Sequence, residues 1–383
     1  MNIAYFTDIR SIHGHSWISH FASAHRTILI CEKDPAGKNL YENDSRITVY
    51  PVLPKTYPLR NFAERNAAVR EVKKILRDCK TDIAHSMYAL PYAFWPWHAR
   101  FPRHIATTRG SDVLVHFRNN REKAKTWKEK LIHAALDRRM IRSLDAAQCI
   151  TCTSTQQEQV IRTMVRNHAK IHLVRTGVDT RNFLAHCKGT QPAGPPVLLS
   201  NRAMTPLYNI HLLVEAFALL KKSGRFPGMR MIVLNYQSDP AYFERVKKTV
   251  ADEKLENEIE FREKQNPQEL AALYDQCHAV LMAPEQDGSP VSGVETLLAR
   301  KPLLLPPLDY DKQVFGPGAV WHFRDYSAAS IAESISEILA KDKNELEQKT
   351  KPGFDAAMLH ADRDSQLAKV EELYRHMMKN PRA

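Results

Sequence analysis

Two carboxylates, Asp287 and Glu295, stand eight positions apart within residues 284–299, a stretch that also contains Gly288 and Gly293. An apolar run precedes this stretch and a helical pattern follows it, so the order predicted is strand, loop and helix start. Small loop residues let backbone N–H groups approach a ligand, and the start of a helix attracts anions. The stretch predicts a site for an anionic, hydroxyl-bearing ligand. A polar surface loop in which Glu295 is merely a helix-start carboxylate is the alternative.

Arg202 is the second residue suited to chemistry, because it directly follows the apolar run at residues 197–200. Its guanidinium presents a rigid fork of donors that matches phosphate oxygens. A solvated arginine after a strand is the alternative reading. Arg202, next to Asn201, is therefore a candidate for phosphate binding.

Polar residues also follow or end predicted strands in the first half, namely Gly14, His15, His85 and the stretch Arg109-Gly110-Ser111-Asp112. A histidine at such a strand end can contact a sugar, although packed or surface histidines are the alternative.

Metal ligation is not expected. The sequence has no His, Cys or carboxylate triple with helical metal-site spacing, so we predict no metal. The lone CxxC pair, Cys149 and Cys152, is interpreted as buried strand cysteines.

Both halves of the 383-residue chain alternate short apolar runs with longer helical patterns, which is typical of βαβ units. The fold class predicted is α/β, with two Rossmann-like, doubly wound domains that face each other across a cleft. The expected boundaries are a first domain at 1–186, a Gly- and Pro-containing linker at 187–196, a second domain at 197–360, and a C-terminal helix at 361–383 that can return to the first domain. No GxGxxG follows a predicted strand, and GxxxxGK[ST] is missing, which argues against nicotinamide and P-loop nucleotide binding.

These motifs resemble those of the retaining glycosyltransferase family 4, whose fold is GT-B. Residues 287–295 match a branch of that family that reads D-G-x-P-x-S-x-x-E, and Tyr208-Asn209 matches the Tyr-Asn of the same branch. Three further stretches are similar to family motifs: residues 174–183, residues 200–217, and the R-G-S-D at residues 109–112.

The resemblance implies a retaining, metal-independent hexosyl- or glycosyltransferase. Its nucleotide-sugar is a substrate, so no cofactor is expected. Glu295 would hold the ribose hydroxyls, Asp287 would face the transferred sugar, and Arg202 would bind the diphosphate; these three are the catalytic candidates. The donor-binding set is Asn201, Arg202, Tyr208, Asn209, Asp287, Gly288, Ser289, Pro290, Val291, Ser292 and Glu295. The acceptor-side set is Gly14, His15, His85, Arg109, Gly110, Ser111 and Asp112.

Three departures from the family pattern favour an alternative, a catalytically degraded GT-B protein that binds a partner. Tyr208 stands where the family usually has a phosphate-binding lysine, Arg300 replaces a glycine, and Asn235-Tyr236-Gln237 replaces G-x-G.

Positive charge is concentrated in the first half. Residues 1–190 hold 31 Lys and Arg against 16 Asp and Glu, while the rest of the chain holds 24 against 27. Residues 118–142 carry nine basic and three acidic residues, interleaved with Trp127, Leu131 and Ile132. This stretch fits a solvated helix or a surface on anionic lipid. Nucleic acid is the third option, but no nucleic-acid motif accompanies the stretch. The positive charge of the first half also leaves a basic anion-binding protein as an alternative function.

The start of the chain lacks the pattern of a secretory signal, and no apolar run is long enough to span a bilayer, so a cytoplasmic location is expected. Together with the charge, this predicts a protein that is peripheral at the inner face of the membrane. Its partners would be a nucleotide-sugar donor, a glycan or lipid-linked acceptor, and an anionic membrane surface, with no nucleic acid.

Overall fold

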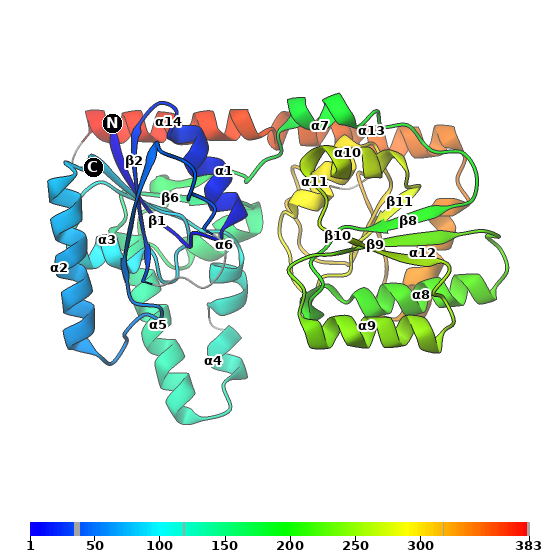
Figure 1. Ribbon diagram of the computed structural model, residues 1–383, viewed down its shortest axis with the longest axis horizontal. Coiled ribbons are helices and arrows are strands. Elements are labelled where there is room, and N and C mark those ends of the chain that lie inside the picture. Colours follow the sequence, from blue (N-terminus) through cyan, green and yellow to red (C-terminus); the bar gives the residue numbers. More distant parts are fainter. Residues whose placement is uncertain (34–38, 118, 317, 381–383) are drawn as a thin grey trace. The chain divides into compact units, whose positions relative to one another are not determined.

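A computed structural model describes residues 1–33, 39–117, 119–316 and 318–380 (Figure 1). The chain forms two compact units: unit 1 comprises Met1–Val174 and the chain from Leu367 on, and unit 2 comprises Arg175–Gln366. Each unit is built on one parallel sheet with helices on its faces, which confirms the predicted fold class.

Unit 1 contains a seven-stranded parallel sheet in the order β3-β2-β1-β4-β5-β6-β7. Alternate residues of β1 pack into different clusters on the two faces, Ile3 and Tyr5 in one and Ala4 and Phe6 in the other. Burial on both faces explains why its strands are continuous apolar runs. The strands are β1 (Asn2–Phe6), β2 (Arg26–Glu32), β3 (Ile47–Leu53), β4 (Ile83–Ser86), β5 (His104–Thr107), β6 (Cys149–Cys152) and β7 (Ile171–Leu173).

The helices of unit 1 include the end of the chain. They are α1 (Ile12–Phe21), α2 (Phe62–Asp78), α3 (Phe94–Ala99), the π-helical turn η1 (Ser111–His116), α4 (Asn119–Lys123), α5 (Trp127–Ala146), α6 (Thr155–Arg162), the 3-10 turn η2 (His168–Lys170) and most of α14 (Arg363–Lys379). Tyr374 of α14 is buried in unit 1, where its hydroxyl lies 3.0 Å from that of Tyr5. The C-terminal helix therefore returns to the first unit, as expected.

One long helix was expected across residues 122–144, but the structure has two. The chain breaks before Thr126, whose side chain accepts a hydrogen bond from the Glu129 N–H, while the Glu129 carboxylate accepts one from the Thr126 N–H. Such a capping box marks a helix start, so a new helix begins at Trp127. In Figure 1, α4 and the first turns of α5 extend away from the sheet of unit 1. Arg118, the first basic residue of this stretch, lies outside the described residues.

Unit 2 contains a six-stranded parallel sheet in the order β10-β9-β8-β11-β12-β13. The strand order reverses between β8 and β11, which are direct neighbours, with Leu198 opposite Ala279. In such sheets, ligands bind at the carboxyl ends of the strands flanking the reversal. The strands are β8 (Val197–Ser200), β9 (Arg230–Asn235), β10 (Ile259–Glu263), β11 (Ala279–Leu281), β12 (Leu303–Leu305) and β13 (Trp321–His322).

Helices cover both faces of this sheet. They are α7 (Thr180–His186), the 3-10 turn η3 (Pro206–Tyr208), α8 (Ile210–Lys222), α9 (Pro240–Asp252), α10 (Pro267–Asp275), α11 (Val291–Leu298), α12 (Ala328–Leu339) and α13 (Lys343–His360). α8 and α12 pack on one face and α10 and α11 on the other, each group around its own apolar cluster.

The division into units differs from the expected boundaries. The Gly- and Pro-containing stretch 187–196 is a loop inside unit 2, where the N–H groups of Lys188 and Thr190 donate to the Asp275 carboxylate. α7 also belongs to unit 2, because Phe183 packs in its core against the Tyr274 ring. The chain passes between units after Val174 and after Gln366. Glycine and proline therefore indicate a loop here but not a domain boundary.

Candidate active site

The candidate donor site lies at the carboxyl ends of β8 and β11, the two strands at the reversal of strand order in unit 2. Asn201 and Arg202 directly follow β8, and residues 282–290 join β11 to α11. The predicted strand, loop and helix around residues 279–299 therefore correspond to observed elements. The topology brings together two motifs that are about 85 residues apart in the sequence, as the Arg202–Asp287 contact shows.

Arg202 is held by two residues of the Asp287–Glu295 motif. Its Nη2 donates to Asp287 Oδ2 at 2.7 Å, and its Nη1 donates to Ser292 Oγ at 2.8 Å. The guanidinium also lies 4.2 Å from the centre of the Tyr208 ring. Arg202 is only 8% exposed, and burial opposes its charge, but the Asp287 carboxylate more than compensates, so its pKa is raised above the usual range. The site therefore holds a permanent cation whose Nε makes no hydrogen bond within the described chain.

Glu295 contacts the same group of residues from α11. Its Oε2 lies 3.0 Å from the Tyr274 hydroxyl and 3.3 Å from Asn201 Nδ2, which itself donates to that hydroxyl at 3.0 Å. Desolvation outweighs the Tyr274 hydrogen bond and the charge of Arg202, so the pKa of Glu295 is raised to about 7. Glu295 is the fifth residue of α11 rather than part of its first turn, which removes the simple helix-start reading of this carboxylate.

The loop before α11 is fixed by its own main chain. The Gly288 N–H donates to Asp287 Oδ1 at 2.8 Å, and the Gly288 carbonyl accepts from the Asp311 N–H at 2.8 Å. Pro290 occupies the N-cap of α11 and makes no side-chain capping bond. The first N–H groups of this eight-residue helix, which starts at Val291, thus lack a side-chain acceptor at the cap, and a bound anion can supply one. Ser289 is partly exposed beside them.

Tyr208 and Asn209 form the entrance to α8. Asn209 has a left-handed backbone, with φ of 48°, and its Nδ2 donates to the Ala283 carbonyl at 3.1 Å. Glycine and asparagine tolerate that conformation best, which explains the preference for them at this motif position. Gln237 and Arg300, which replace family glycines, are left-handed as well. Both departures therefore keep the backbone conformation that glycine favours.

Two tyrosines of this site were missed in the sequence. Tyr274, fully buried on α10, joins Asn201 to Glu295, and Tyr236 after β9 is close enough to Arg202 and Glu295 to interact with both electrostatically. Tyr274 falls within an apolar helical pattern, where a tyrosine is indistinguishable from a core residue. Tyr236 could have been found, because it occupies the middle of the replaced G-x-G.

The acceptor-side residues of unit 1 lie in different surroundings. Gly14 is the third residue of α1 rather than part of a loop, and its N–H donates to Ser11 Oγ at 3.0 Å. His15 lies one position on in the same helix, with its ring against Tyr41. His85 is fully buried on β4, with Nδ1 2.6 Å from the Tyr374 hydroxyl and Nε2 2.6 Å from Thr107 Oγ1. Burial, and secondarily Arg109, lowers its pKa well below the ordinary value.

Residues 109–112 lead from β5 into η1, with Gly110 at the N-cap of η1. The buried Asp112 carboxylate accepts the N–H groups of Ala89, Arg109, Gly110 and Val113 at 2.9–3.1 Å. Gly110 has φ of 109°, a conformation that other residues rarely adopt. Burial lowers the pKa of Arg109 to about 10, and its guanidinium lies 4.4 Å from the Trp17 ring centre.

Ser111 is the first residue of η1, and its hydroxyl hydrogen-bonds to that of Tyr88. The R-G-S-D motif thus forms the start of η1, where the Asp112 carboxylate accepts hydrogen bonds from main-chain N–H groups.

Among the described residues, no three His, Cys, Asp or Glu side chains gather closely enough to hold a metal ion. The six cysteines are free and buried, and Cys149 and Cys152 pack in different apolar clusters. The CxxC pair is therefore part of a buried strand, as predicted. Within the same described residues, no helix is long and apolar enough to cross a membrane.

Two protein families match this chain by their sequence models. Residues 185–352 match the glycosyl transferases group 1, and residues 2–154 match the family described as glycosyl transferase 4-like. A search of curated proteins finds no match. The two matches and the presence of one parallel sheet in each unit define the chain as a glycosyltransferase with the GT-B fold.

Solved structures agree with this fold over almost the whole chain. Sucrose-phosphate synthase from Thermosynechococcus elongatus is 18% identical, with a TM-score of 0.76 and 99% of both chains covered. Anabaena HepE in complex with UDP is 14% identical, with a TM-score of 0.74 and 98% of this chain and 100% of that one covered. WaaG, a glycosyltransferase involved in lipopolysaccharide biosynthesis, is 14% identical, with a TM-score of 0.69 and 97% and 99% covered. At such identities, these likenesses concern the fold.

Proposed function

We propose that this glycosyltransferase binds a nucleotide-sugar donor in unit 2 and transfers the sugar to a glycan or lipid-linked hydroxyl with retention of configuration. The observation that supports this most is the convergence of Arg202, Asp287, Ser292 and Glu295 after β8 and β11. HepE, which shares the fold, has been solved with UDP and with UDP-glucose. UDP is therefore the first nucleotide to test.

In this reaction the acceptor oxygen bonds to the anomeric carbon while the bond from that carbon to the diphosphate breaks. The hydroxyl proton leaves with the departing diphosphate, whose negative charge grows. Arg202 and the N–H groups at the start of α11 would stabilise that charge. Asp287 is already paired with Arg202, so we propose no covalent intermediate on it. Charge stabilisation by an arginine and a helix start also makes a metal ion unnecessary in this scheme.

The nucleotide assignment is tested by thermal shift and calorimetry against UDP, GDP, ADP, CMP and dTDP. We expect one nucleoside diphosphate to stabilise the protein, by about 2.7 kcal/mol at 100 times its Kd. At the same nucleotide concentration, binding weakened 10- to 100-fold in the Glu295→Ala variant should reduce this stabilisation to about 0.4–1.4 kcal/mol. If no nucleotide stabilises the wild type, the catalytic proposal is wrong and a partner-binding role gains support.

A second part of the proposal concerns the acceptor, and it comes from α4 and α5. Residues 121–131 are almost entirely exposed, and within them Trp127 is 68% and Leu131 59% exposed. Lys123, Lys125, Lys128 and Lys130 flank these apolar side chains. Basic residues around exposed aromatic and aliphatic ones suit an anionic lipid surface. The proposed enzyme is therefore peripheral at the cytoplasmic face and acts on a membrane-anchored or anionic acceptor.

Replacing Lys123, Lys125, Lys128 and Lys130 with Gln tests this surface. Each lysine near an anionic membrane contributes about 1 kcal/mol, so the variant should be released from vesicles containing phosphatidylserine, and added salt should weaken the wild type in the same way. Replacing four exposed lysines elsewhere in unit 1, namely Lys55, Lys73, Lys74 and Lys80, changes the charge equally and should leave vesicle binding much less affected. Equal loss in both variants would indicate general charge attraction instead of a defined surface.

A further inference from the structure

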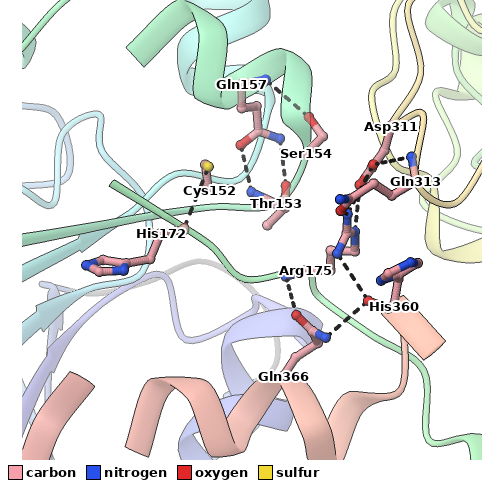
Figure 2. A network of polar contacts seen from close by, with 10 residues as sticks. All are labelled: Cys152, Thr153, Ser154, Gln157, His172, Arg175, Asp311, Gln313, His360 and Gln366. Carbon is pink, nitrogen blue, oxygen red and sulfur yellow. Dashed lines mark hydrogen bonds and ion pairs between the residues drawn. The ribbon is translucent and has the colours of Figure 1, made fainter. Parts of the chain in front are cut away.

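Arg175 is the first residue of unit 2, and its charge is almost completely buried, with 3% of the residue exposed. Its guanidinium donates twice to the Asp311 carboxylate, from Nε at 2.6 Å and from Nη2 at 3.1 Å (Figure 2). Nη2 also donates to Gln313 Oε1 at 2.6 Å. A buried ion pair is weak evidence for stability, because desolvation offsets the attraction between the charges. We therefore ask which segments of the chain the Arg175–Asp311 pair holds in place.

Asp311 connects this ion pair to the candidate donor site. Its N–H donates to the Gly288 carbonyl at 2.8 Å, so the turn that carries Asp311 is bonded to the loop containing Asp287. Phe315, four residues after Asp311, approaches α11 itself. A Cβ on Gly293 would lie 2.9 Å from the Phe315 ring, which shows how closely the two segments approach. The position of the loop is therefore tied to the position of Asp311.

Arg175 also holds the segment by which the chain leaves unit 2. Its N–H donates to Gln366 Oε1 at 3.1 Å, and Gln366 Nε2 donates to the His360 carbonyl at 3.1 Å (Figure 2). The Val178 N–H donates to the Ala361 carbonyl nearby. The entering and leaving segments are thus bonded side by side, with Arg175 between them and the Asp311 turn.

We propose that Arg175 is a positioning residue for the nucleotide-sugar site. Through Asp311 it fixes the main chain at Gly288, and with it the Asp287 carboxylate that contacts Arg202. This inference rests on the proposed function, which assigns the loop containing Asp287 and Gly288 to donor binding.

The experiment compares four variants: Arg175→Lys, Arg175→Met, Asp311→Asn, and the double variant Arg175→Met with Asp311→Asn. The double variant removes both buried charges, so it avoids leaving one of them unpaired. The matched control is Arg363→Gln, which breaks the half-exposed Arg363–Asp179 pair near the leaving segment without touching the donor loop. UDP affinity is measured by calorimetry, and hydrogen–deuterium exchange is followed in peptides covering residues 285–298 and 197–200.

We expect UDP binding to weaken about tenfold in Arg175→Met and in the folded double variant, within the usual range for residues that act through others. Exchange should rise at residues 285–298 but not at 197–200, and saturating UDP should reduce the rise. Arg175→Lys should be intermediate, and Arg363→Gln should resemble the wild type.

Wild-type affinity and exchange in the folded double variant would overturn the positioning role. Equal losses in Arg363→Gln would also overturn it, because the effect would then be general damage. Failure of the wild type to bind UDP counts instead against the proposed nucleotide, and exchange at 285–298 still decides whether Arg175 fixes the loop.

Discussion

The donor-side residues of unit 2 and the acceptor-side residues of unit 1 both follow or end strands of a parallel sheet, yet their surroundings differ. In unit 2, Arg202, Asp287 and Glu295 come from separate segments and form one connected group of charges. In unit 1, His85 and Asp112 are buried and satisfied by their own unit. The Asp287–Glu295 motif therefore predicted side chains that the structure brings together with Arg202. Single polar residues at strand ends mainly predicted side chains that hold the fold of unit 1.

The strongest test of this comparison is Arg202→Ala. If Arg202 stabilises charge growing on the diphosphate, its loss should lower turnover about 100- to 1,000-fold, as when one donor is removed from a charge-stabilising site. Arg202→Lys should recover only part, because an ammonium cannot replace the bidentate fork. UDP release from UDP-glucose measures the effect. The control is Arg262→Gln, which removes a partly exposed arginine of the same unit that pairs with Glu260. Normal turnover in a folded Arg202→Ala protein would remove Arg202 from the catalytic residues.

Glu295→Ala should produce the next largest effect, on nucleotide affinity. Loss of a hydrogen bond to a charged group costs about 1.5–3 kcal/mol, so UDP should bind roughly 10- to 100-fold more weakly by calorimetry. Glu285→Ala serves as the control, because Glu285 lies two residues before Asp287 and its side chain is exposed. Equal affinities in the two variants would contradict the assignment of Glu295 to the ribose.

Glu295 should also make stability depend on pH in a characteristic direction. Its pKa is raised from an ordinary 4.5 to about 7, so between those values the folded protein holds a proton that the unfolded chain has released. Stability should therefore fall as pH rises through that window. Relative to Glu295→Gln, the wild type should lose on the order of 1–3 kcal/mol between pH 4.5 and 8 in urea unfolding. Parallel pH profiles for the two proteins would show that Glu295 is not desolvated.

Much of the fold follows from the sequence, since continuous apolar runs correctly indicated strands that are buried on both faces. The predictions that were wrong concern local geometry. The helix expected across residues 122–144 is divided by the capping box of Thr126, and the glycine-containing stretch 187–196 is a loop packed on Asp275. Hydrophobic periodicity predicts neither the break before Thr126 nor the packing of residues 187–196. It indicates which residues are buried, but not where a helix is interrupted or where one core ends and the next begins.

The donor-side group could be predicted because its residues form motifs, and the rest of its surroundings could not. Tyr274 and Asp311 reach the site only through packing of α10 and of the turn after β12. Gly177, in the motif at residues 174–183, is a residue whose identity the backbone geometry explains directly. Its φ is 72°, and a Cβ there would lie 2.6 Å from the Arg363 backbone, so only glycine fits.

The smallest effect on turnover is expected for His85→Leu, which tests the unit 1 side of the comparison. Loss of the imidazole removes hydrogen bonds to Tyr374 and Thr107, although these hydroxyls keep contacts with Tyr5 and Thr151. Leaving buried polar groups less satisfied should cost about 1–3 kcal/mol of stability, measured by urea unfolding, while UDP release from UDP-glucose stays within twofold of the wild type. A large loss of turnover in a folded His85→Leu protein would return His85 to the acceptor side. Polar residues at strand ends would then predict functional sites as well as the Asp287–Glu295 motif does.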